Sequence, residues 1–155
     1  TLAPGAERLE LFAQEPPLVG IDGLAFAEDG TLYINNVRDN LVQRVGLDAD
    51  GDYAGIATLE LDDTLSGPDG LRPLGGGRFI QAEGPGGRVA IIDISGDSAT
   101  VTPVKTGLDS SPGVTAVGGI GYATEGKIGY LIDPELSGQD PGPFIIRAFE
   151  LPQGE

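Results

Sequence analysis

The chain has 155 residues with no cysteine and no histidine, and 24 acidic against 9 basic side chains give it a formal charge of −15. This composition excludes disulfides, histidine-dependent catalytic triads and thiolate or histidine metal ligands within the chain. The charge argues against binding to nucleic acid or to an anionic membrane surface.

Turn residues divide the chain into short segments, with 26 glycines and 12 prolines among its residues. This content is typical of β architectures built from short strands. No segment approaches the roughly 18 consecutive apolar residues of a membrane span. The absence of methionine predicts a processed or fragmented piece of a longer product, and we expect a periplasmic or secreted location.

The first predicted element is a strand at residues 7–14, where apolar and polar side chains alternate. Residues 20–66 follow as a unit of four strands. Val, Ile, Leu and Tyr enrichment between Gly and Asp boundaries predicts them at 23–27, 31–35, 41–47 and 55–61. Asp29-Gly30 is expected to form the first hairpin turn, because glycine supplies the positive φ that such a turn requires.

Two further units repeat this pattern. Residues 67–111 are predicted to contain strands at 71–74, 78–82, 88–94 and 100–105. Residues 112–155 are predicted to contain strands at 114–117, 121–124, 129–132 and 144–151. No helix is expected.

The three units align on Gly23, Gly70 and Gly113, which are 47 and 43 residues apart. A strand-rich repeat of this period is the signature of β-propeller blades. The predicted fold class is therefore an all-β propeller with three four-stranded blades and one orphan N-terminal strand, the outer strand of a preceding blade within residues 1–19. Since a propeller ring needs about 4–8 blades, we expect half of a ring, closed by a second copy of the chain or by a separate N-terminal half.

Equivalent positions of the blades converge at one mouth of a propeller. The residues before the first strand of each unit are Asp22, Asp69 and Pro112, and those at the end of the second strand are Asn36, Glu83 and Glu125. Carboxylate and amide oxygens suit Ca²⁺, Mg²⁺ or Mn²⁺. The alternative is that the two aspartates are turn residues and that the two glutamates are solvated strand ends.

Other conspicuous segments are interpreted as structural. Asp48–Asp52 resembles the start of a calcium loop but lacks the glycine and glutamate that an EF-hand requires, so it is predicted as a hairpin turn. The glycine-rich segments at 75–77 and 84–87 are also predicted as turns, because no helix follows them. Tyr33, Phe79 and Tyr122 lie inside predicted strands, and we expect them in the core.

Several motifs resemble the senescence-marker-protein, gluconolactonase and luciferin-regenerating-enzyme-like superfamily of six-bladed propellers. They are Gly23-Leu24-Ala25-Phe26, Asp29-Gly30-Thr31-Leu32-Tyr33, Gly67-Pro68-Asp69-Gly70-Leu71, Gly126-Lys127-Ile128-Gly129-Tyr130-Leu131 and the ending Asp140-Pro141-Gly142-Pro143-Phe144. The resemblance covers nearly the whole chain but only the second half of such a protein.

The resemblance implies an axial divalent cation, held in that family by a glutamate of the first blade, an asparagine of an Asn-Gly turn and an aspartate of a Pro-Asp-Gly turn. Asp69 matches that aspartate, Asp22 stands where the asparagine would be, and the first-blade glutamate has no counterpart here. The expected metal ligands are therefore Asp22 and Asp69, with Ca²⁺ the first candidate and Mg²⁺, Mn²⁺ or Zn²⁺ the others.

The implied activity is metal-dependent hydrolysis of a small cyclic ester or sugar-acid lactone, performed by the completed ring. Asp69 would be both ligand and catalytic base, and Asn36, Glu83 and Glu125 would contact substrate. The alternative is a non-catalytic propeller that binds a small ligand or a protein partner at the same mouth.

Overall fold

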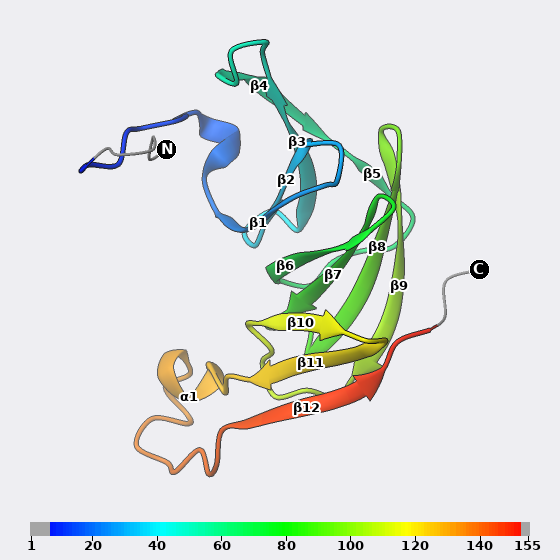
Figure 1. Ribbon diagram of the computed structural model, residues 1–155. Helices are drawn as coiled ribbons and strands as arrows, with labels where there is room; N and C mark the ends of the chain where they lie inside the picture. Colours follow the sequence, from blue (N-terminus) through cyan, green and yellow to red (C-terminus); the bar gives the residue numbers. More distant parts are fainter. Residues whose placement is uncertain (1–6, 153–155) are drawn as a thin grey trace.

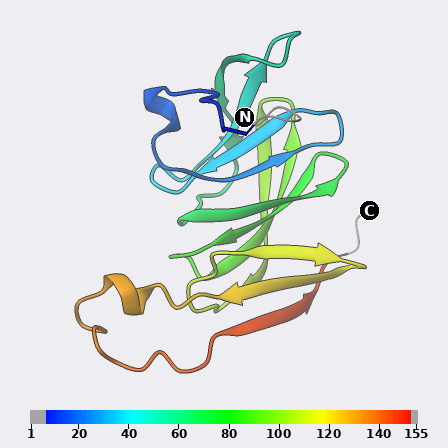
Figure 2. The same ribbon diagram turned by 60° about the vertical axis from the view of Figure 1, so that its left-hand side comes forward.

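The computed structural model describes residues 7–152, which form three mainly antiparallel sheets stacked in chain order (Figure 1). The view in Figure 2 shows the same stack turned, with the inner strands one above another. None of the helices in this part of the chain has the length and apolar character needed to cross a membrane. The predicted all-β fold class is confirmed.

The first sheet contains four strands in the order β1 (Ile21–Phe26), β2 (Leu32–Asn36), β3 (Leu41–Leu47) and β4 (Tyr53–Thr58). The β1–β2 turn is the predicted one: Gly30 has a φ of 85°, and the Thr31 amide donates to Asp29 Oδ1 at 2.9 Å. Asp48–Asp52 is also a turn, between β3 and β4, in which Asp48 Oδ1 accepts the amides of Asp50 and Asp52.

The second sheet has the order β5-β9-β8-β7-β6. Its strands are β5 (Glu60–Leu61), β6 (Pro68–Gly75), β7 (Arg78–Glu83), β8 (Arg88–Ser95) and β9 (Ser98–Thr106). The single strand predicted at 55–61 is wrong at its end, because β5 pairs in parallel with β9 of the second sheet. Leu59, buried between the two sheets, marks the point where the chain crosses from one to the other. The two glycine-rich segments are turns, as predicted.

The third sheet has only three strands, β10 (Val114–Val117), β11 (Ile120–Glu125) and β12 (Ile145–Glu150), in that order. The strand predicted at 129–132 is wrong, since Gly129–Ile132 is the single helical turn α1. Leu131 and Ile132 are 85% and 75% exposed, so their apolar side chains do not pack in the core of a sheet. The predicted last strand is present, but it pairs directly with β11.

The N-terminal segment precedes a short 3-10 turn, η1 (Pro16–Leu18), and lies beside the first sheet (Figure 1). Residues 9–15 carry no strand. The outer strand predicted at 7–14 is therefore not formed, and no described strand pairs with this segment.

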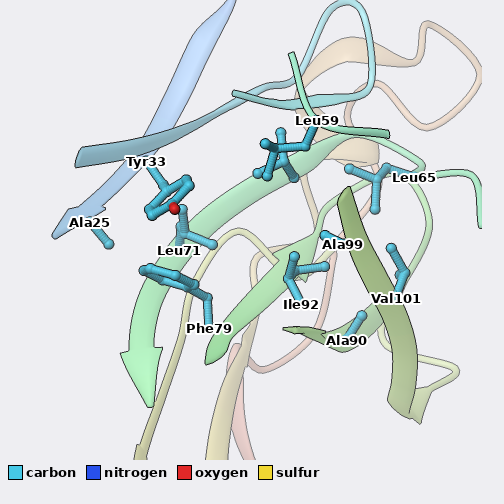
Figure 3. Close-up of a cluster of buried hydrophobic side chains, with 11 residues drawn as sticks. Ala25, Tyr33, Leu59, Leu65, Leu71, Phe79, Ala90, Ile92, Ala99 and Val101 are labelled. Atoms are coloured by element: carbon cyan, nitrogen blue, oxygen red, sulfur yellow. The ribbon is translucent and has the colours of Figure 1, made fainter. Parts of the chain in front are cut away.

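The core lies between successive sheets, and the middle sheet is covered on both faces. Figure 3 shows the cluster between the first two sheets, in which Tyr33 and Phe79 meet edge to face with ring centroids 5.2 Å apart. A second cluster joins the middle sheet to the third through Ile80, Val89 and Val114, among others. Tyr122 is 37% exposed, so its predicted core position is wrong; it lies on the face of the last sheet that no other described sheet covers.

The repeated glycines permit close contact between the inner strands. A Cβ on Gly23 would collide with the carbonyl oxygen of Asp69 and lie 2.9 Å from the Cβ of Leu71. A Cβ on Gly70 would lie 2.9 Å from the carbonyl oxygen of Pro112. Strand β1 therefore packs on β6, and β6 on β10, at distances that only glycine allows.

Candidate functional site

Asp22 and Asp69 lie side by side at the beginnings of the neighbouring inner strands β1 and β6. Asp22 is exposed, whereas Asp69 is half-buried. Burial, the negative charge of Asp22 and a hydrogen bond between the two side chains raise the pKa of Asp69 to about 6. A carboxyl group whose pKa is raised by burial and by a neighbouring carboxylate is a candidate for acid–base chemistry.

Asn35 fixes the backbone behind this pair. Its Oδ1 accepts the Gly23 amide at 2.7 Å, and its Nδ2 donates to the Asp69 carbonyl at 2.6 Å and to Gln81 Oε1 at 3.2 Å. Asn35 is fully buried, and its side-chain amide links the backbone of β1 to that of β6 next to Asp22 and Asp69. Asn35 lies at the end of the strand predicted at 31–35, but this linking role was not predicted from the sequence; a polar residue after the apolar positions of β2 was the available signal.

Gln81 lies next to this amide and is also fully buried. Its Nε2 has no hydrogen-bond partner within the described part of the chain. A buried donor without a partner costs about 1–3 kcal/mol, and an ordered water is the usual partner of such a group.

Asn36 is fully buried at the end of β2 and already has partners. Its Nδ2 donates to the Val19 carbonyl at 3.0 Å, and its Oδ1 accepts the amides of Arg38 and Asp39, both at 3.0 Å. The side chain thus joins the end of β2 to the loop that leads into β1.

Glu83 occupies the position in the second blade that Asn36 occupies in the first, and it likewise joins the end of its strand to a neighbouring loop. It is fully buried, its Oε2 accepts the Ser66 amide at 2.6 Å, and its Oε1 accepts Arg88 Nε at 2.8 Å. In the third blade Glu125 is 6% exposed and pairs with Arg147 Nε at 2.7 Å. The solvated strand end considered for both glutamates is therefore wrong.

The structure thus separates the predicted site residues into two groups. Asp22 and Asp69 come together with carboxyl groups directed at each other. Asn36, Glu83 and Glu125 occupy equivalent blade positions and are hydrogen-bonded within their own blades. Their predicted role in substrate binding stays a prediction.

The carboxylate pair has the oxygen ligands that a hard divalent cation prefers, but two side chains are too few to enclose one. Across residues 7–152, no group of three or more acidic side chains is arranged to hold a metal ion. A cation at this point would need further ligands from outside the described chain.

Comparisons with known proteins place the fold. No family model matches the sequence, and no curated protein matches it. Among solved structures, a luciferin-regenerating enzyme superposes with a TM-score of 0.61 at 20% identity, covering 84% of this chain and 45% of that one. A putative gluconolactonase gives 0.52 at 23% identity, with 66% and 34% covered. The calcium-binding protein regucalcin from Agrobacterium tumefaciens gives 0.51 at 20% identity, with 67% and 37% covered.

These similarities confirm the propeller fold, and they are to the kinds of protein that the sequence motifs resemble. The chain spans less than half the length of each of these structures. A streptogramin B lyase also superposes, with a TM-score of 0.56 at 16% identity, so the fold alone does not assign an activity.

Proposed function

We propose that the chain is one half of a lactonase-like propeller that hydrolyses a small cyclic ester or sugar-acid lactone with the help of a divalent cation. The observation that carries the proposal is the Asp22–Asp69 carboxylate pair at the inner edge of two adjacent blades, with the pKa of Asp69 raised to about 6. Gluconolactonase and regucalcin, named among the structural neighbours, support both the substrate class and a divalent cation.

Asp22 and Asp69 would hold the cation together with ligands from the missing half, and Ca²⁺ is the first candidate because all the donors are oxygens. When bound, such a cation polarises the lactone carbonyl and lowers the pKa of a coordinated water. Asp69 would accept the proton of the attacking water, since a carboxylate with a pKa near 6 is deprotonated at neutral pH yet basic enough to take a proton.

The test uses the complete assembly. Calorimetric titration with Ca²⁺, Mn²⁺, Mg²⁺ and Zn²⁺ is expected to show one site per ring mouth, and an aldonolactone series is expected to show hydrolysis that Asp69→Asn abolishes. Asp50→Asn, in the exposed β3–β4 turn, is the matched control and should keep both properties. If no ion binds at millimolar concentration, the metal-dependent proposal is wrong.

The second candidate is a non-catalytic propeller that binds a small ligand at this mouth. Gln81 Nε2, which lies beside Asn35 and has no partner among residues 7–152, favours it, since a free donor is suited to holding a neutral or anionic oxygen. Ligand binding without turnover, unaffected by Asp69→Asn, would support this candidate over hydrolysis.

A further inference from the structure

The contact between adjacent blades repeats in a defined way. The Gly70 amide of the second blade donates to the Pro112 carbonyl of the third at 3.1 Å, and the missing Cβ of Gly70 leaves room for that carbonyl. Gly23 and Asp69 make the corresponding close approach between the first and second blades. Each blade thus presents a glycine to the next blade and a carbonyl to the previous one.

No fourth sheet covers Gly113, the third glycine of the repeat, among the described residues. Within the described residues, the only atom within 4 Å of a Cβ built there is Thr124 Oγ1 of its own blade, at 3.3 Å. At the other end of the stack, the backbone carbonyl of Asp22 has the same place in the first blade as the carbonyls of Asp69 and Pro112 have in the second and third blades. The two ends of one chain therefore carry the two complementary halves of a single repeated contact.

The sheet faces at the two ends are also apolar and incompletely covered, although Ile34 in the first of them is only 4% exposed beneath the N-terminal segment. The first-blade end face consists of Leu24, Phe26, Leu32 and Ile34, which pair across β1 and β2 on the side opposite the core residue Ala25. Leu24 and Phe26 are 57% and 53% exposed. The end face also lines an apolar pocket of about 190 Å³ beneath the N-terminal segment.

The third-blade end face consists of Thr115, Val117, Tyr122 and Ile146. Thr115 pairs with Tyr122 in the β10–β11 ladder, and the opposite side of that ladder packs on the middle blade. Val117 and Ile146 are 69% and 70% exposed. Apolar sheet faces of this kind are usually covered by another layer.

The strand count and the chain length also fit a second chain of the same kind. The third blade has three strands and leaves the outer edge of β12 unpaired in the described sheet. The N-terminal segment brings an alternating stretch whose Leu9 and Leu11 are 80% and 78% exposed, the pattern of a strand without its sheet. Since this chain covers 45% of the luciferin-regenerating enzyme, two copies would nearly span a complete propeller.

We propose that two copies of this chain close into one ring. The third-blade end face of each copy packs on the first-blade end face of the other, with Gly113 against the second copy's Asp22 carbonyl. The N-terminal segment of one copy supplies the fourth strand to β12 of the other. Two identical contacts related by a twofold axis close such an assembly without leaving a free end.

The ring also completes the mouth, because each copy contributes its own Asp22 and Asp69. Four carboxylates then face one axis, which gives a cation the additional ligands that one chain lacks. Each copy carries −15, so like charge opposes association at low ionic strength, and the dimer is expected to strengthen as salt screens it.

Sedimentation equilibrium and native mass spectrometry of the full chain test the proposal. The expected mass is twice the chain mass of 15.9 kDa at micromolar concentration in 0.15 M salt or above. A species that stays at 15.9 kDa up to about millimolar concentration and at all salt concentrations overturns the proposal, and indicates that a different polypeptide covers the end faces.

Matched variants locate the interface. Thr115→Asp puts a charge on the third-blade end face, whereas Thr102→Asp puts the same charge at an exposed position of β9 in the middle blade. We expect Thr115→Asp and Gly113→Val each to weaken dimerisation by at least about tenfold, with unchanged circular dichroism of the monomer, and Thr102→Asp to have no effect. A dimer that tolerates both end-face variants overturns the proposed interface. A dimer that binds no cation and opens no lactone contradicts the proposed function alone.

Discussion

The carboxyl group of Asp69 is hydrogen-bonded to that of Asp22, and burial together with this neighbour raises the pKa of Asp69 to about 6. The two residues belong to different blades and are 47 positions apart in the chain. They meet because Gly23 allows β1 to approach β6 closely and because Asn35 holds the Gly23 amide and the Asp69 carbonyl together.

Replacing Asp22 should change the titration of Asp69 in a defined direction. Asp22→Asn removes the neighbouring negative charge, so the pKa of Asp69 is expected to fall from about 6 toward 3.8. It should remain above 3.8, because burial is the largest cause of the shift and is unchanged. Carbon-13 NMR of the side-chain carboxyl groups measures this directly, and a pKa that stays at about 6 in the variant would contradict the coupling.

The same pair predicts a contribution to the pH dependence of stability. The folded chain binds the Asp69 proton more tightly than the unfolded chain does, so this contribution to the free energy of unfolding is full below pH 3.8 and decreases as pH rises to about 6. Chemical denaturation of the wild type and of Asp69→Asn at several pH values isolates the effect, since the other carboxylates are common to both. The difference between the two proteins should change between pH 3.8 and about 6 and be constant above pH 7.

Glu83 is expected to be a stability residue of the second blade. Glu83→Ala leaves Arg88 without its buried partner and the Ser66 amide without its acceptor, which should lower the free energy of unfolding by about 3 kcal/mol. Asp97→Asn breaks the Arg44–Asp97 ion pair, in which Asp97 is 82% exposed, and should change stability little. Urea denaturation compares the two variants, and equal effects would refute this role for Glu83.

The recurrence of glycine and aspartate at a fixed spacing predicted the β-propeller fold, most strand positions and the closeness of Asp22 to Asp69. It could not predict that Gly129–Ile132 forms α1, since apolar composition does not distinguish a buried strand from an exposed turn. It also missed the burial of Glu83 and Glu125. Both are buried against arginine partners, Arg88 and Arg147, and no local sequence pattern identifies these ion pairs. Tyr122 is exposed for a different reason, because no other described sheet packs on its face of the third sheet.

The glycine repeat itself can be tested within the single chain. Gly23→Ala puts a Cβ against the Asp69 carbonyl oxygen and 2.9 Å from the Cβ of Leu71, and neither can move without separating β1 from β6. Overpacking of this kind costs about 1–3 kcal/mol. Gly113→Ala meets only Thr124 Oγ1 at 3.3 Å among the described residues, so at concentrations where the chain is monomeric its unfolding midpoint should stay close to that of the wild type. Thermal unfolding of both variants, with sedimentation to verify the monomer, makes the comparison. If Gly113→Ala lowers the unfolding midpoint as much as Gly23→Ala does, Gly113 is required within its own blade. Its glycine would then not indicate a contact with a further blade.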